Sequence, residues 1–155
     1  QKLLTDYLIH IGNLSLNENQ KLEVTNMFNT ITDVERAADH AENIAEQAQY
    51  AQDHDISFSE IGQDDLKKIS NKVMESFEAS IDAFENNDLD AVVRTAHLED
   101  QVDEMEEDMR ETHILRLSSG DCVPQAGVIF LDVISDLERI SDHADNVAGY
   151  VKTMI

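Results

Sequence analysis

Apolar residues recur three or four positions apart along most of the chain, which is the spacing of one face of an α-helix. The pattern predicts five helices, at about residues 2–11, 20–52, 59–86, 88–117 and 124–154. The longest keeps this spacing from Val24 to Ala48 without a break. No stretch alternates in the manner of a β-strand. We therefore expect an all-α protein, folded as an antiparallel helical bundle whose core includes Met74, Met105 and Met109.

Polar connections rich in helix-capping residues separate these stretches. Gly120 suits the end of the fourth helix, and Pro124 suits the first turn of the fifth. The chain opens with Gln1, already in helical register and without a start methionine. We therefore expect the first helix to be the tail of one that begins earlier in a longer protein.

The charge balance excludes several classes of partner. The chain has 33 acidic and 11 basic residues, a net charge of −22. Binding to nucleic acid and to anionic lipid depends on basic residues, so neither is expected as a direct partner. An acidic surface attracts cations instead. The single cysteine, Cys122, excludes an internal disulfide, and no stretch approaches the roughly 18 consecutive apolar residues of a membrane span.

A segment of the sequence is duplicated. Residues 33–45 read DVERAADHAENIA, and residues 136–148, 103 positions later, read DLERISDHADNVA. Eight of these 13 positions are identical, including Arg, His and Asn at the same places. Chance similarity between two acidic helices would not reproduce all three. We call this the duplicated segment, and it indicates two copies of one structural unit.

The acidic residues of the duplicated segment lie on one flank of its helix. A turn of about 100° per residue places Glu35 and Asp39 on that flank in the first copy, and their equivalents in the second. The helix at 88–117 carries acidic residues at the same angular offset. When two neighbouring helices run antiparallel, flanks at the same angular offset face the same seam between them. The acidic residues of the two helices also lie a similar number of positions from Gly120 along the chain. Four carboxylates should therefore converge on the seam: Glu99, Asp103, Glu138 and Asp142.

Converging carboxylates repel one another unless they are protonated or neutralised. Oxygen-rich clusters suit hard or borderline metal ions, so these four residues are the predicted metal site, with iron, zinc, manganese or magnesium as candidates. Glu35 and Asp39 are a half-formed equivalent, because their partners would fall before residue 1. The alternative is a solvated acidic face, which arises easily in a chain this acidic.

The opposite flank is interpreted as structural. Arg36 and Arg139 are each expected to pair with the aspartate three positions earlier. His40 and His143 are expected to form hydrogen bonds rather than to bind metal, because they point away from the carboxylates.

The duplicated segment, DxERxxDHAxN on the third helix of a three-helix unit, resembles the PhoU family of phosphate-uptake regulators. Members typically have two three-helix repeats whose Glu/Asp-x-x-x-Asp motifs bind metal ions. The likeness is closer to the cytoplasmic PhoU-like domain at the C-terminal end of bacterial sodium/phosphate cotransporters, which has a similar turn at 118–124 and a similar AGVIFL at 126–131. This resemblance makes residues 59–155 a complete repeat and residues 1–52 a truncated first repeat.

The resemblance implies a regulatory domain of a sodium-dependent phosphate transporter, on the cytoplasmic side of the bacterial inner membrane. Its partner would be the membrane-embedded transporter part of the same polypeptide. The alternative is a free-standing PhoU-type regulator acting on an ABC transporter and a sensor kinase. Neither is an enzyme. A di-metal carboxylate oxidase would need Glu-x-x-His motifs, and none of the six histidines has a Glu three residues before it.

A first repeat that lacks a helix predicts an under-covered apolar surface. The stripe concerned is Met27, Ile31, Val34 and Ala38. Such a surface tends to be buried by another copy or by a displaced helix, so we expect a homo-oligomer.

Overall fold

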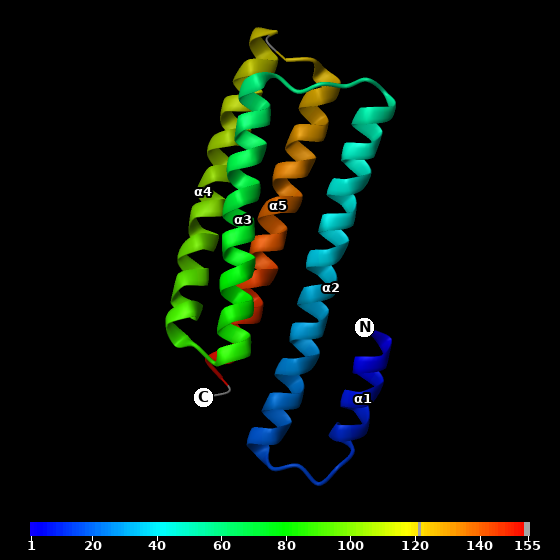
Figure 1. Cartoon of the computed structure of the whole chain (residues 1–155), viewed down its shortest axis with the longest axis vertical. Helices are drawn as coiled ribbons and strands as arrows, with labels where there is room; N and C mark the ends of the chain where they lie inside the picture. The colour runs from blue at the N-terminus through cyan, green and yellow to red at the C-terminus, as the bar shows by residue number, and fades with distance from the viewer. Residues whose placement is uncertain (121, 154–155) are drawn as a thin grey trace.

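The computed structural model describes residues 1–120 and 122–153, and all regular elements in that part of the chain are α-helices (Figure 1). They are α1 (Lys2–Gly12), α2 (Glu18–Asp53), α3 (Glu60–Asn86), α4 (Leu89–Ser119) and α5 (Pro124–Val151). The prediction of an all-α bundle with five helices is confirmed. The predicted end of the last helix, residue 154, lies outside the described residues.

Local chemistry explains where the helices begin and end. At the start of α2, the Asn17 side chain accepts a hydrogen bond from the Gln20 backbone N–H at 2.9 Å, and the Gln20 side chain accepts from the Asn17 N–H at 3.0 Å. The Asp88 side chain caps α4 in a similar way. After α4, Gly120 adopts a left-handed conformation with φ +82°, which a residue without Cβ adopts at little cost. These features are local, which is why the sequence predicts them well.

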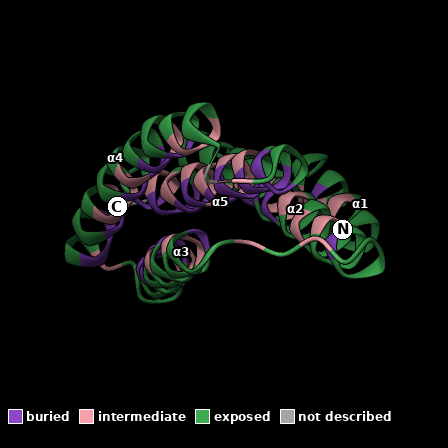
Figure 2. Cartoon of the chain, turned by 90° about the horizontal axis from the view of Figure 1, so that it is seen from above, coloured by how far each residue is buried: buried purple, intermediate pink, exposed green. Residues whose placement is uncertain are grey.

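Helix α5 lies at the centre of the fold. It packs against α2, α3 and α4, whereas α1 packs only on α2. Seen end-on, α4, α5, α2 and α1 form one row, and α3 covers one face of the row beside α4 and α5 (Figure 2). Helices α3, α4 and α5 are thus a complete three-helix unit, while α1 and α2 extend the row on the far side of α5.

The hydrophobic core lies inside the α3–α4–α5 unit. Ile69, Val102, Phe130 and Ile134 are completely buried there. Each such side chain contributes about 1.5–3 kcal/mol relative to an exposed position. A second, smaller cluster around Val92 holds the other end of the unit together. No helix in the described part of the chain is long and apolar enough to cross a membrane.

Helix α4 approaches α5 closely at Gly127. A Cβ atom at this position would lie 2.8 Å from the side chain of Leu117 and 2.9 Å from that of His113. Because real Cβ atoms essentially never come so near, the absence of a side chain permits the contact. This approach fixes one end of the seam between α4 and α5.

One apolar prediction for α3 is wrong. Met74 was expected in the core, but 57% of its surface is exposed. The face of α3 that packs on α5 carries small residues instead, and Ser76, Ala79 and Ala83 are all buried. Met74 directly follows the buried Val73, and a turn of about 100° per residue carries its side chain away from this buried face.

The predicted under-covered stripe on α2 is present. Met27 is 42% exposed and Val34 is 47% exposed. Ala38 is exposed as well, and Ile31 is half-buried. The stripe lies on the part of the row that α3 does not cover.

Candidate functional site

The two copies of the duplicated segment contact each other where α2 runs antiparallel to α5. His40 Nδ1 in the first copy lies 2.7 Å from Oδ1 of Asp136 in the second. Reciprocally, His143 Nδ1 lies 2.8 Å from Oδ1 of Asp33. The asparagine three positions after each histidine donates to the same carboxylate oxygen, at 3.4 Å in both copies. Each copy therefore supplies the acceptor for the histidine and asparagine of the other.

This arrangement has approximate two-fold symmetry. The rings of His40 and His143 stack near its centre, with centroids 5.7 Å apart. The prediction that these histidines form hydrogen bonds is confirmed. The first Asp, the His and the Asn of the duplicated segment are identical in both copies, and they are the residues that join the copies.

The symmetry is broken at Asp33. The hydroxyl of Tyr150 donates a third hydrogen bond to this carboxylate, at 2.7 Å. Burial, and after it the hydrogen bond to Asp33, raises the pKa of Tyr150 to about 12. The position 103 residues earlier is Gln47, which supplies no equivalent hydroxyl. Asp33 is accordingly the more buried of the two aspartates, at 6% exposure.

The prediction for the two arginines is wrong. Arg139 pairs with Glu138 at 3.4 Å and with Asp142 at 3.2 Å instead of with Asp136. Among the described ion pairs, Arg36 and Asp33 are not joined either, because His143 on α5 holds Asp33. The two aspartates are held by histidines across the helix pair, and Arg139 pairs with other acidic residues of its own helix.

Carboxylates do converge on the seam between α4 and α5, which we call the acidic seam. Burial raises the pKa of Glu99 to about 7, with further contributions from the charges of Asp142, Asp145 and Asp103. Burial also raises the pKa of Glu138, and the charge of Asp142 adds to this while Arg139 opposes it. The charges that raise these two pKa values lie on both helices, with Asp103 on α4 and Asp142 on α5.

Two acidic residues of the seam are missing from the predicted set. Burial raises the pKa of Asp145, an effect that Lys152 opposes. Glu106 is 7% exposed and pairs with Arg110. Both lie three positions after a predicted ligand, Asp142 and Asp103 respectively, so helix spacing alone places them on the same acidic flanks.

The acidic seam has side chains of the right type for a metal ion, but they are not grouped closely enough to hold one. Carboxylate oxygens suit hard cations. However, within residues 1–120 and 122–153, no three His, Cys, Asp or Glu side chains lie in a group that could hold an ion. Arg139 interacts with two of the predicted ligands and partly neutralises them. The metal site stays a prediction.

Glu35 and Asp39 on α2, the predicted half-formed metal site, are less enclosed than the carboxylates of the acidic seam. The side-chain amide of Gln1 donates to Glu35, and Asp39 is exposed. Gln1, the N-cap of α1, is the residue that contacts Glu35, and α1 carries no acidic residue except Asp6. The described chain therefore brings no opposing carboxylate pair to this flank.

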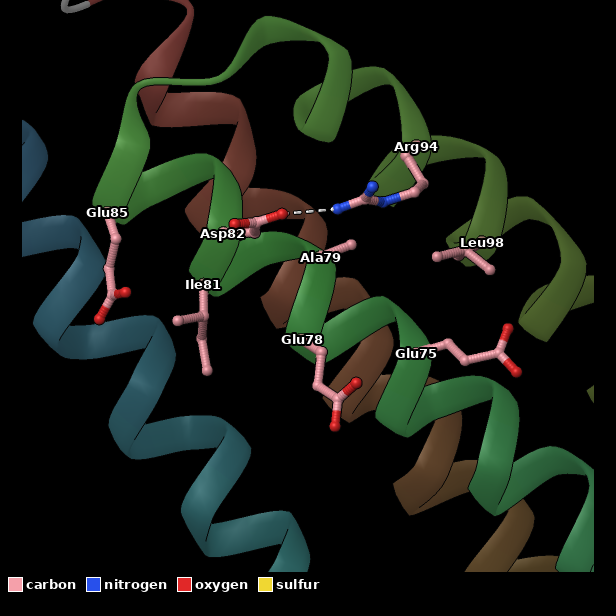
Figure 3. A pocket seen from close by; sticks show the side chains of 8 residues that line it. All are labelled: Glu75, Glu78, Ala79, Ile81, Asp82, Glu85, Arg94 and Leu98. Atoms are coloured by element: carbon pink, nitrogen blue, oxygen red, sulfur yellow. Dashed lines mark hydrogen bonds and ion pairs between the residues drawn. The ribbon is translucent and has the colours of Figure 1, made fainter.

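A groove of about 500 Å³ on the other side of α4 is not a candidate site. It lies between α3 and α4, and an ion pair of 2.9 Å between Arg94 and Asp82 crosses it (Figure 3). Both side chains are about half exposed, so the pair contributes little to stability. None of the predicted metal-binding residues lines this groove.

The chain resembles known proteins over more than half of its length. Residues 66–151 match the PhoU domain. Over 119 residues the chain is 29% identical to the phosphate-specific transport system accessory protein PhoU homolog 1 of Thermotoga maritima. The alignment covers 77% of this chain and 50% of that protein, so the chain spans about half the length of this relative. No solved structure matches the chain. On the match over residues 66–151, the chain belongs to the PhoU domain family.

Proposed function

We propose that the chain is a regulatory module of phosphate uptake that works through protein contacts rather than catalysis. The observation that carries the proposal is the PhoU domain match, which contains the acidic seam and the second copy of the duplicated segment. The relative is described as an accessory protein of a phosphate-specific transport system. Its description supports the free-standing regulator, acting on an ABC transporter and a sensor kinase, better than the cotransporter domain that the sequence resemblance first favoured.

Phosphate uptake in the bacterial host tests this proposal. Deletion of the gene should change the initial rate of radiolabelled phosphate uptake at least twofold, and expression of the protein should restore it. Affinity purification from solubilised membranes should recover the subunits of an ABC phosphate transporter. Unchanged uptake in the deletion strain would contradict the proposal, and recovery of a sodium-coupled transporter instead would favour the cotransporter reading.

The proposed regulation includes a cation at the acidic seam. The carboxylates of Glu99 and Glu138 support this, because burial and after it the charges of Asp142 and Asp103 raise the pKa of both, and a cation would relieve the repulsion from these charges. Binding would require Arg139 to release Glu138 and Asp142. Removing this competitor in Arg139→Gln should therefore increase the affinity for metal.

Thermal melting after chelation tests the cation. Iron, zinc, manganese and magnesium are each added back to wild type, to Arg139→Gln and to Asp103→Asn/Asp142→Asn. A metal that binds only the folded chain should stabilise wild type by about 2.7 kcal/mol at a hundredfold excess over its dissociation constant. Glu35→Gln/Asp39→Asn is the matched control on α2. Equal gains in wild type and in the seam variant would show that the seam is a solvated acidic face.

A further inference from the structure

A groove lies between the C-terminal half of α2 and the first turns of α5. Its volume is about 570 Å³. The lining includes Glu46, Gln47 and Tyr50 of α2, and Val128, Ile129 and Asp132 of α5. Ile129 is buried, whereas Val128 is 61% exposed and Tyr50 is 51% exposed. We call this the α2–α5 groove, and its surface combines apolar side chains with two carboxylates.

The α2–α5 groove opens on the face of the molecule opposite α3. The hydroxyl of Ser141 on α5 donates to that of Ser76 on α3 at 3.1 Å. Asp132 precedes Ser141 by nine positions, which is about two and a half helical turns, so the two side chains point in opposite directions. Val128 lies one turn before Asp132, on the same side of the helix. Because α3 covers only one face of the row (Figure 2), the groove lies on the face that α3 leaves free.

The other end of the α2–α5 pair is closed at the equivalent place. There, the side-chain amide of Asn26 donates to the hydroxyl of Thr153 at 2.7 Å, and Asn26 is buried. The equivalent positions, 103 residues away, hold Ile129 and Tyr50. Ile129 has no polar side-chain atom and cannot form this hydrogen bond. One end of the pair is therefore joined by a buried polar contact, whereas the other end exposes an apolar surface.

Unpaired carboxylates border the α2–α5 groove. Glu46 and Asp132 are both exposed, and neither belongs to an ion pair within residues 1–120 and 122–153. A smaller polar hollow of about 240 Å³ adjoins the groove, shares these two carboxylates and adds Asn43 and Ser135. A Lys or Arg side chain placed there could form charge-assisted hydrogen bonds to the carboxylates. An acidic side chain would be repelled.

We propose that the α2–α5 groove docks a segment of another protein that carries one bulky apolar side chain next to a Lys or Arg. The apolar side chain packs on Val128 and Tyr50, and its burial supplies affinity. The cation lies in the adjoining hollow between Glu46 and Asp132 and supplies orientation and fast association. This docking goes beyond the proposed function and does not depend on it, because direct binding tests it.

A second copy of this chain is the competing occupant, and the homo-oligomer stays a prediction. Each copy carries a net charge of −22, so two copies repel each other. Glu46 and Asp132 add negative charge at the place where a second copy would have to lie. The charge therefore favours a basic partner over self-association.

Titration of the isotope-labelled chain, followed by heteronuclear NMR, tests the docking. The probe is the capped dipeptide acetyl-Phe-Arg-amide, and the comparison peptides are acetyl-Phe-Glu-amide and acetyl-Gly-Arg-amide. Two variants alter the groove, Val128→Lys and Asp132→Asn. Val93→Lys is the matched control, because Val93 is an exposed apolar residue of α4 outside the groove, 54% exposed against 61% for Val128.

The Phe-Arg probe should shift the amide resonances of Tyr50, Val128 and Asp132 saturably, and it should bind at least fivefold more tightly than either comparison peptide. Val128→Lys should weaken binding at least fivefold and Asp132→Asn at least threefold, while Val93→Lys leaves it within twofold. Circular dichroism confirms that the variants remain folded. Equal affinity for the Gly-Arg peptide, or equal weakening by Val93→Lys, would show general charge attraction and overturn the proposal. A dimer in sedimentation velocity that Val128→Lys dissociates would assign the groove to a second copy and overturn it as well.

Discussion

The first copy of the duplicated segment lies on α2, which packs against α5 and α1, whereas the second lies on α5, which packs against three helices. Both copies form continuous helix, and both use the same Asp and His positions to join each other. Their apolar stripes differ, because Ala144 is completely buried under α3 while Ala41 is exposed. The two copies are thus similar in sequence and contact each other through the same residues, but the apolar stripe of the second copy is much more buried than that of the first.

The largest expected difference between the copies comes from one substitution made in each. Ala144→Leu forces extra volume against α3 and should lower the free energy of unfolding by about 2–3 kcal/mol. Ala41→Leu places the same volume at an exposed position of α2, where the change should stay within about 0.5 kcal/mol. Urea denaturation followed by circular dichroism measures both. Similar losses in the two variants would mean that the face of α2 is covered in solution.

The reciprocal aspartates should differ by a smaller amount. Asp33→Ala removes an acceptor that serves His143, Asn146 and Tyr150, and it should cost about 2 kcal/mol of unfolding free energy. Asp136→Ala leaves only a histidine and an asparagine without their acceptor, on a more exposed site, and it should cost about 1 kcal/mol.

A double-mutant cycle between Asp33→Ala and His143→Ala measures the coupling directly by chemical denaturation. The two single losses should not add, because both variants remove the same hydrogen bond. Strict additivity, or a larger loss in Asp136→Ala than in Asp33→Ala, would contradict the reciprocal arrangement.

The smallest expected effect is the pH dependence of the acidic seam. Burial raises the pKa of Glu99 from 4.5 to about 7, so the folded chain holds this proton more tightly than the unfolded chain. Its stabilising contribution is therefore fully present below about pH 4.5 and is lost as the pH rises through 7. Solvent screening of this partly exposed group reduces the expected loss to about 1 kcal/mol between pH 5 and 8.

Glu99→Gln removes the titrating group and should flatten that part of the stability curve. Urea denaturation at a series of pH values compares the variant with wild type. Parallel curves over pH 5–8 would show that Glu99 does not titrate in this range and that the carboxylates of the seam are not coupled.

Helix geometry explains why part of the candidate site could be predicted. A position in an α-helix fixes an angle around the helix axis, and the short connection at Gly120 makes α4 and α5 antiparallel neighbours. These two facts are sufficient to place Glu99 and Glu138 on a common seam. They do not give the distances between the carboxylates, so the sequence could not distinguish a ready metal site from one that includes Arg139.

The sequence by itself determined the five helices, their caps and the duplication, because spacing and capping depend on residues within a few positions. Only the tertiary structure decided that Asp33 is held by His143, 110 positions away, instead of by the nearby Arg36. It also decided that Met74 is exposed, although the helical pattern predicted it in the core. The physical reason is that a helix's own sequence sets which residues share a face, whereas the neighbouring helices that the chain supplies set what that face touches.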